Sequence, residues 1–179
     1  MRVISGRLKG KILKGPDDIR PVTSMIKEAI FNTLNWVDWE NSKVLDLFCG
    51  AGNFGVEAIS RGARYVVFID KSRKSIEFVR KNLEGVDWNG KLIISDFKSA
   101  IKNLFKKNEK FNIIFADPPF DLFLGDEVLK NIEKYDLLDS SGIVILRVRD
   151  KEKINCLDGW IVDVRKYGDS IVYYLSKDR

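Results

Sequence analysis

An apolar run at residues 111–116 leads directly into Asp117, Pro118, Pro119 and Phe120. A short run rich in Ile and Phe is typical of a buried strand in a parallel sheet. The two prolines must end that strand, because neither has an N–H group and both hold φ at about −65°. Open α/β sheets bind their ligands at the carboxyl ends of such strands. The tetrapeptide is therefore either a stiff ligand-facing turn or a turn that only ends the strand.

Strand and helix patterns alternate over most of the chain. Apolar runs predict strands at residues 44–48, 65–69, 91–95, 111–116 and 143–148. Amphipathic patterns predict helices at residues 53–61, 72–85, 97–107 and 124–135, preceded by a helix that Thr23 or Ser24 caps. Strands at 160–166 and 170–175 close the chain as a hairpin. We expect an α/β fold with a doubly wound sheet, mostly parallel with a terminal antiparallel strand.

The first 20 residues form a basic arm that we expect to precede a single domain at residues 21–179. Six basic and two acidic residues give this arm +4 of the chain's formal charge of +5. Residues 2–5 and 11–14, joined through Gly6 and Gly10, predict a small β-hairpin. Concentrated positive charge among glycines suits contacts with the phosphates of RNA or DNA. The expected RNA-binding residues are Arg2, Arg7, Lys9, Lys11 and Arg20.

Composition excludes several classes of site. Two cysteines, Cys49 and Cys156, and no histidine leave neither a disulfide framework nor a zinc cluster, and they exclude His-based acid–base catalysis. No apolar stretch approaches the ~20 residues needed to span a bilayer, and residues 1–7 lack the apolar core of a signal peptide. We expect a cytoplasmic monomer that binds neither a membrane nor a metal.

A glycine-rich loop follows the first predicted strand of the alternating region. Gly50, Gly52 and Gly55 form the pattern G-x-G-x-x-G between a strand and a helix, which is typical of a nucleotide-binding turn. Gly50 would allow the tight turn, Gly52 a close ligand approach, and Gly55 close packing of helix on sheet. Asp70, at the end of the next strand, would accept hydrogen bonds from ribose hydroxyls. The loop alone fits a dinucleotide and an adenosine-type cofactor equally well.

Carboxylates near the strand ends distinguish these two cofactors. Asp46, inside the first strand, would repel a pyrophosphate but would stabilise the ammonium and sulfonium of S-adenosylmethionine. Asp96 and Phe97 follow the third strand, where they suit the amino group and ring face of adenine. Asp46 could instead cap the glycine loop, and Asp96 could be a helix N-cap. Taken together with Asp70, the set favours S-adenosylmethionine over a nicotinamide dinucleotide.

These motifs resemble a known enzyme class. Asp46-x-Phe48-x-Gly50-x-Gly52 followed by Asp-Pro-Pro-Phe resembles the class I methyltransferases that modify exocyclic amino groups of nucleobases. Over residues 1–175 the chain is similar to the bacterial 16S ribosomal RNA guanine-N2 methyltransferases that act on guanine 966. The segments that carry this closer resemblance are residues 2–11, Arg20-Pro21-Val22-Thr23 and residues 57–63.

The resemblance implies a Rossmann-like class I methyltransferase sheet, S-adenosylmethionine as cofactor, and 16S ribosomal RNA or the small ribosomal subunit as partner. It implies that Asp117 and the Pro118 carbonyl accept the two N–H bonds of the target amine, while Phe120 stacks on a flipped base. The expected cofactor-binding residues are Asp46, Phe48, Gly50, Gly52, Asn53, Asp70, Lys71, Asp96 and Phe97.

The chain departs from the family pattern at several positions. Arg147 and Arg149 stand where the family tends to be acidic, which leaves the role of that region open. Cys49, in the cofactor loop, is expected to be a small buried residue, which disfavours a thiol-dependent methylation of pyrimidine carbon 5. Three other functions stay open as alternatives to guanine-N2 methylation. They are an adenine-N6 methyltransferase with the same chemistry, a non-catalytic RNA-binding protein with this fold, and a nicotinamide dehydrogenase.

Overall fold

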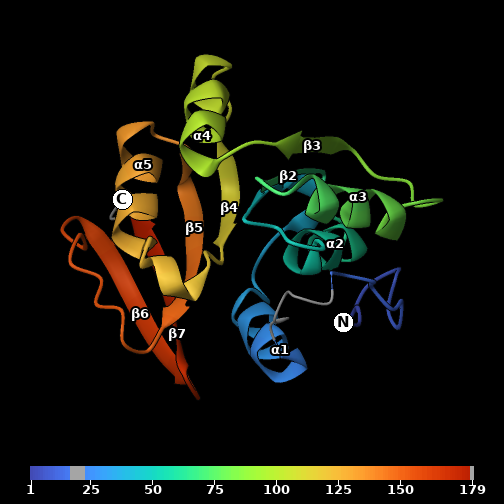
Figure 1. Ribbon diagram of the computed structural model, residues 1–179, viewed down its shortest axis with the longest axis horizontal. Helices are drawn as coiled ribbons and strands as arrows, with labels where there is room; N and C mark the ends of the chain where they lie inside the picture. The colour runs from blue at the N-terminus through green and yellow to red at the C-terminus, as the bar shows by residue number, and fades with distance from the viewer. Residues whose placement is uncertain (17–22, 178–179) are drawn as a thin grey trace.

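The computed structural model describes residues 1–16 and 23–177. In this part of the chain, seven strands form one sheet in the order β3-β2-β1-β4-β5-β7-β6 (Figure 1). Strands β1 to β5 are parallel, and β7 runs antiparallel to both β5 and β6. The predicted α/β sheet with a terminal antiparallel strand is confirmed. The strands are β1 (Lys43–Leu47), β2 (Tyr65–Asp70), β3 (Gly90–Ile94), β4 (Phe111–Ala116), β5 (Leu138–Arg149), β6 (Trp160–Tyr167) and β7 (Ser170–Lys177).

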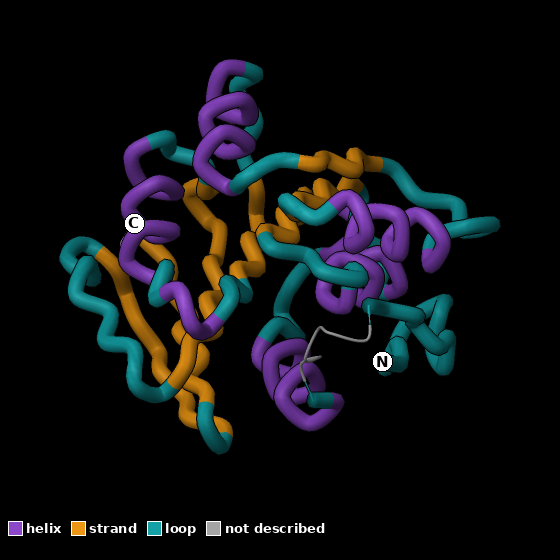
Figure 2. Tube along the Cα trace, viewed as in Figure 1, coloured by secondary structure: helices purple, strands orange, loops and turns teal. Residues whose placement is uncertain are grey.

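Five α-helices connect or precede these strands in the described residues (Figure 2). Thr23 caps the first, because its hydroxyl accepts the Ile26 N–H at 3.3 Å, as predicted. The Ser72 hydroxyl caps the third by accepting the Ser75 N–H at 3.2 Å. The helices are α1 (Ser24–Thr33), α2 (Asn53–Ser60), α3 (Arg73–Asn82), α4 (Phe97–Lys106) and α5 (Gly125–Lys134), with 3₁₀ turns η1 (Trp39–Asn41) and η2 (Phe120–Leu122).

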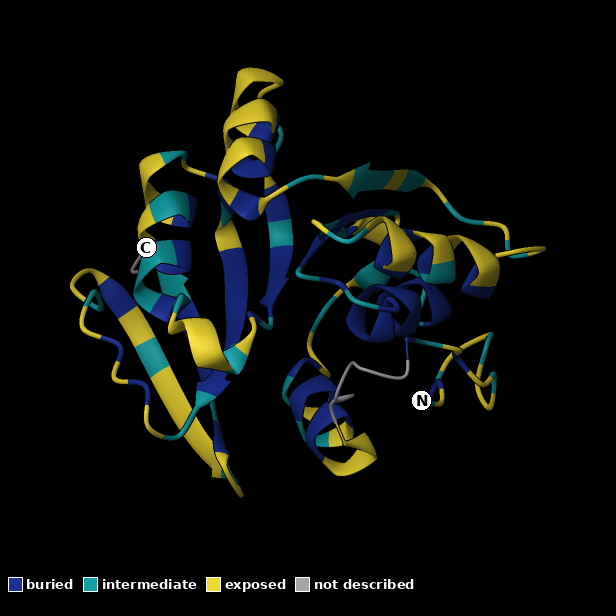
Figure 3. Cartoon of the chain, viewed as in Figure 1, coloured by how far each residue is buried: buried dark blue, intermediate teal, exposed yellow. Residues whose placement is uncertain are grey.

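The helices cover the two faces of the sheet in separate layers (Figure 1). Helices α1, α2 and α3 pack on one face, where Val44 and Phe115 point. Helices α4 and α5 pack on the other, where Leu45 and Ile114 point. Side chains alternate along each strand, so neighbouring residues enter opposite layers. Both faces of the central strands are therefore buried, whereas β6 at the edge is largely exposed (Figure 3).

The predicted N-terminal hairpin is present in a short form. Arg2 and Ile12 form an antiparallel bridge, and the Val3 and Leu13 N–H groups donate to the carbonyls of Lys11 and Met1 at 2.9 and 2.8 Å. Figure 2 draws this arm as loop. The backbone amides of Ile4 and Ser5 donate to the two carboxylate oxygens of Glu57, at 2.8 and 3.0 Å. The arm therefore keeps cross-strand hydrogen bonds and is also docked on α2 through the amides of Ile4 and Ser5.

The arm is also part of the main core. Val3 and Leu13 are buried among side chains of α1 and α2. Arg20 and the other residues between 16 and 23 lie outside the described residues.

Strand β5 begins at Leu138, whereas the sequence predicted a start at Ile143. The pairing with β4 jumps from Phe111↔Leu138 to Ile113↔Ile143, so the intervening residues bulge out of the ladder. That stretch, residues 139–142, is polar or glycine and hid the true start of the strand.

Candidate functional site

A cleft of about 1160 Å³ opens at the carboxyl ends of the parallel strands. Its walls come from residues 48–51 after β1, 70–72 after β2, 95–98 after β3 and 117–122 after β4. The end of β5 adds Arg147 and Arg149. The structure thus brings the glycine loop and the Asp-Pro-Pro-Phe turn, which are far apart in sequence, to one site.

The Asp70 carboxylate holds the glycine loop in place. Its Oδ2 accepts the Gly50 N–H at 2.9 Å and its Oδ1 accepts the Ser72 N–H at 2.8 Å. Gly50 has φ of 53°, a left-handed conformation that glycine adopts without strain. Each carboxylate oxygen keeps a second lone pair, and Asp70 lines the cleft, so its contact with a ribose stays a prediction.

Phe48 ends β1 one residue earlier than predicted, because its φ is 68°. A positive φ is uncommon for an aromatic residue and costs on the order of 1–3 kcal/mol. This conformation places the Phe48 ring 5.2 Å from that of Phe97. Both rings line the cleft and form an apolar wall between the ends of β1 and β3.

Asp46 is buried beneath the loop and lies outside the residues that line the cleft. Its Oδ2 accepts the Gly55 N–H at 2.8 Å, which caps the N-terminal end of α2. Burial raises the pKa of Asp46 to about 7; the Gly55 hydrogen bond opposes this shift, and the nearby Asp117 and Asp70 carboxylates add to it. The observed role is the capping alternative, and a contact with a cationic cofactor stays a prediction.

Gly52 and Gly55 face the protein interior. A Cβ at Gly55 would lie 2.1 Å from Cε1 of Phe68, so only glycine allows α2 to approach β2 this closely, as predicted. A Cβ at Gly52, where φ is 86°, would meet Val56 and Phe68 at 3.2 and 3.3 Å. Gly52 is not among the residues that line the cleft, so its cofactor contact stays a prediction.

Asp96 is the N-cap of α4. Its Oδ1 accepts the Ser99 N–H at 3.0 Å, and this hydrogen bond lowers the pKa of the carboxyl. Asp96 nevertheless lines the cleft beside Phe97, and exposed Lys71 lines it from the end of β2. Capping therefore leaves Asp96 available to a ligand.

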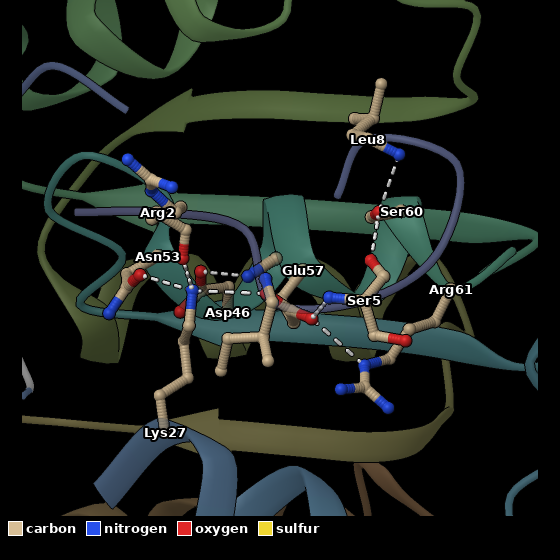
Figure 4. Close-up of polar contacts among 11 residues, drawn as sticks. Arg2, Ser5, Leu8, Lys27, Asp46, Asn53, Glu57, Ser60 and Arg61 are labelled. Carbon is tan, nitrogen blue, oxygen red and sulfur yellow. Dashed lines mark hydrogen bonds and ion pairs between the residues drawn. The ribbon is translucent and has the colours of Figure 1, made fainter. Parts of the chain in front are cut away.

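Asn53 and Lys27 join the cleft to the arm and were not predicted to act together. Lys27 Nζ donates to the Arg2 carbonyl at 2.6 Å and to Asn53 Oδ1 at 3.0 Å, and it lies 3.1 Å from Glu57 Oε2 (Figure 4). Asn53 lines the cleft and is 7% exposed, yet its Nδ2 has no hydrogen-bond partner among the described residues. Because Lys27 fixes the oxygen, the amide nitrogen is a buried donor without a partner among the described residues, and its contact with a cofactor stays a prediction.

Sequence reasoning missed Lys27 and Glu57, although a signal existed for the first. Lys27 stands four residues before Phe31, on the face of α1 that Ile30 and Phe31 bury. A lysine on an apolar stripe indicates a buried ion pair. Burial lowers the pKa of Lys27, and the Glu57 carboxylate opposes that shift.

The Asp-Pro-Pro-Phe turn is in direct contact with Arg147 in the wall of the cleft. Arg147 Nε donates to Asp117 Oδ1 at 2.9 Å and Nη2 donates to Oδ2 at 3.0 Å. Its guanidinium carbon also lies 4.7 Å from the centroid of the Phe120 ring. Burial raises the pKa of Asp117, whereas the Arg147 charge lowers it. Pro118 and Phe120 line the same cleft, so the three predicted catalytic residues lie together.

The basic residues of the arm lie mostly at the surface. Arg2, Arg7 and Lys9 are exposed and Lys11 is half-buried. Arg7 Nη2 donates to the Asp87 carbonyl, so this guanidinium is partly engaged within the protein. RNA binding by these residues stays a prediction.

Cys49 is buried in the wall of the cleft, and burial raises the pKa of its thiol well above the usual range. A protonated thiol at neutral pH is a poor nucleophile, as predicted for this position.

Among residues 1–16 and 23–177, no group of three acidic or cysteine side chains could hold a metal ion. Within the same ranges, every helix is too short or too polar to cross a bilayer.

Comparisons with known proteins agree with this geometry. The family model described as "Conserved hypothetical protein 95" matches residues 1–176. Bacillus subtilis (strain 168) YlbH is 34% identical over 149 residues, covering 81% of this chain and 80% of its own. Escherichia coli (strain K12) "Ribosomal RNA small subunit methyltransferase D" is 28% identical over 178 residues, covering 98% and 88% of the two chains. The solved structure of Escherichia coli yhhF matches with a TM-score of 0.84 at 25% identity, covering 100% and 99%. The chain therefore belongs to the conserved hypothetical protein 95 family, and its sheet has the class I methyltransferase fold.

Proposed function

We propose that the protein transfers a methyl group from S-adenosylmethionine to the exocyclic N2 amine of a guanine in 16S ribosomal RNA, and that this guanine is nucleotide 966. The observation that carries the proposal is the meeting of Asp117 and Phe120 with the glycine loop in one cleft. The name of the Escherichia coli relative, a ribosomal RNA small subunit methyltransferase, supports ribosomal RNA of the small subunit as the substrate. The choice of guanine N2 and of nucleotide 966 comes from the sequence resemblance.

The residues of the cleft fit the proposed cofactor. Asp70 and Asp96 offer acceptors to a ribose and an adenine amine, and Phe48 and Phe97 offer an apolar wall to the ring. The buried, unpartnered Nδ2 of Asn53 offers a donor to a carboxylate. When bound, the cofactor supplies an electrophilic methyl group on a sulfonium.

The turn after β4 would prepare the amine for attack. A base amine is a weak nucleophile, because its lone pair is delocalised into the ring. Asp117 and the Pro118 carbonyl would accept its two N–H bonds and favour a pyramidal nitrogen, while Phe120 stacks on the base. The N–C bond forms as the S–C bond breaks, and the methylated nitrogen then loses one proton. This scheme needs no histidine, and the chain has none.

The arm would bring the RNA to this cleft. Arg2 and Lys9 are exposed on an arm that Glu57 and Lys27 hold against the cofactor loop (Figure 4). Exposed cations on a fixed backbone suit contacts with phosphates, which position a substrate without reading its sequence.

The decisive experiment uses methyl-labelled S-adenosylmethionine with unmethylated 16S ribosomal RNA and, separately, with small subunits. Label in N2-methylguanosine at one site is expected. Asp117→Asn should lower turnover about 10²-fold or more while cofactor affinity is kept. Asp163→Asn, on β6 and outside the cleft, is the matched control.

Each alternative gives a different result in this assay. Label in N6-methyladenine would replace the proposed target, and RNA binding without any label would indicate a non-catalytic protein. Unchanged turnover in Asp117→Asn would remove Asp117 from the mechanism.

A further inference from the structure

Arg147 occupies the space between the two side chains that the proposed reaction requires. Its guanidinium forms two parallel hydrogen bonds with Asp117 and lies over the Phe120 ring. Only 12% of the Arg147 side chain and 18% of the Asp117 side chain are exposed. The pair is therefore a fixed, largely covered contact rather than a loose surface ion pair.

The guanidinium presents the same groups as a nucleobase amine. It is flat, it directs N–H donors in one plane, and it stacks on aromatic rings. A base held by Asp117 and Phe120 would need the same carboxylate oxygens and the same ring face. Resting on the proposed function, we propose that Arg147 is a placeholder that fills the base site in the free protein and must leave before the target base enters.

Electrostatics requires that the placeholder leave before reaction. The amine nitrogen gains positive charge as it takes the methyl group, and the leaving sulfur carries a positive charge before transfer. A guanidinium on Asp117 would repel both charges and would weaken the carboxylate as an acceptor. The Arg147–Asp117 contact of the free protein therefore opposes methyl transfer, whereas the Asp117 carboxylate assists it once Arg147 has left.

The incoming strand supplies the new partner for Arg147. A covered cation that loses its carboxylate needs another anion, because an unpaired buried charge is unfavourable. A phosphate beside the flipped nucleotide meets that need, with the bidentate geometry that arginine prefers. Arg149 lies on the same rim, where it pairs with exposed Asp121 at 3.4 Å. A free nucleoside has no phosphate, so Arg147 acts as a positioning residue that selects polynucleotide over nucleoside.

The first test measures base binding without turnover. Guanosine and adenosine are titrated into the protein saturated with S-adenosylhomocysteine, and Arg147→Ala is compared with wild type. The variant should bind the nucleoside about tenfold more tightly, because one competing charge-assisted contact has been removed. Arg165→Ala is the matched control, because Arg165 also pairs with an aspartate, at 2.9 Å from Asp163, and lies 5.2 Å from the Tyr174 ring, outside the cleft.

The second test adds guanidinium ion to Arg147→Ala during methyl transfer to small subunits. If Arg147 is a placeholder, the turnover of Arg147→Ala at saturating RNA should be at least that of wild type. Millimolar guanidinium should then inhibit the variant in competition with RNA. Lost turnover that guanidinium restores would overturn the proposal, because the arginine would then assist the reaction. Melting temperatures of all variants identify any that fail to fold, and Arg147→Lys, which keeps the charge without the flat fork, provides a second variant.

The two proposals fail separately. If wild type methylates no RNA but Arg147→Ala binds nucleosides more tightly, the placeholder stands and the proposed function falls. If wild type methylates RNA while the variant binds nucleosides no better, the placeholder is wrong and the function stands.

Discussion

Lys27 Nζ lies 3.1 Å from Glu57 Oε2, and the side chains of the two residues are 2% and 0% exposed. Glu57 also receives the backbone amides of Ile4 and Ser5 and the Arg61 Nε at 3.1 Å. One carboxylate thus ties α1, α2 and the N-terminal arm together (Figure 4). A buried carboxylate is tolerated when every lone pair has a donor, and this one has four.

Glu57→Gln should cost about 3–5 kcal/mol of unfolding free energy, because it leaves the Lys27 ammonium buried without its counter-ion. Lys27→Met should cost less, because Glu57 keeps Arg61 and both arm amides. Urea unfolding at neutral pH gives both values. Hydrogen exchange at Ile4 and Ser5 should accelerate in Glu57→Gln more than in Lys27→Met. If the two variants lose the same unfolding free energy, or if Glu57→Gln loses less than ~1 kcal/mol, the Glu57 carboxylate is not what holds the arm on α2.

Every strand except β5 was predictable from sequence to within two residues, because each depends on a local pattern. The bounds of β4 were predicted to the residue, since two prolines must end it at a fixed place. The docking of the arm could not be predicted in the same way. Its glycines and alternating residues indicate a hairpin, which forms in part, but the amides of Ile4 and Ser5 pair with Glu57, about 50 positions away in sequence. Such a long-range partner leaves no local pattern.

In the candidate site, too, features set by a local sequence pattern were predictable and long-range contacts were not. The close packing at Gly55 was predictable, because a glycine loop between strand and helix has fixed requirements. The hydrogen bonds of Asp70 to the Gly50 and Ser72 amides were not predicted, and its contact with a ribose stays a prediction. The partner of Asp117 was not, because Arg147 reaches it only through the parallel pairing of β4 with β5. A basic residue at the end of β5 was visible in the sequence, but nothing local indicated what it would contact.

Asp46→Asn should stabilise the protein at pH 8 and leave its stability unchanged below pH ~4. Burial raises the pKa of this carboxyl from its ordinary value of 3.8 to about 7. The unfolded chain therefore loses this proton first, and the native state becomes progressively less favourable as pH rises from about 4 to about 7. The full penalty is on the order of 4 kcal/mol, which is the upper limit of the gain.

Unfolding free energies of wild type and Asp46→Asn at several pH values between 3 and 9 check this prediction. Asparagine keeps an acceptor for the Gly55 N–H, so the helix cap survives. A constant difference across the pH range would mean that Asp46 ionises normally in the folded protein.

Gly55→Ala should destabilise the fold by about 1–3 kcal/mol, because its Cβ would overlap the Phe68 ring and push α2 from the sheet. A smaller side chain at the same contact should relieve the overlap. Phe68→Leu in the Gly55→Ala background should therefore cost less than Phe68→Leu alone. Thermal unfolding of the four proteins gives this coupling, and additive losses would show that α2 does not approach Phe68 this closely.

Asn53→Asp should weaken S-adenosylmethionine binding about tenfold or more without unfolding the protein. Lys27 still meets an oxygen acceptor, and a negative charge at the first residue of α2 is favourable. The substitution replaces the buried Nδ2 donor of Asn53 with a carboxylate oxygen, which is an anionic acceptor. A cofactor carboxylate that accepts from Asn53 would be repelled there.

Calorimetric titration of S-adenosylmethionine measures the loss, and Asn35→Asp at an exposed position gives the same change in net charge as a control. Tighter binding in Asn53→Asp would mean that the ammonium of the cofactor, rather than its carboxylate, faces α2.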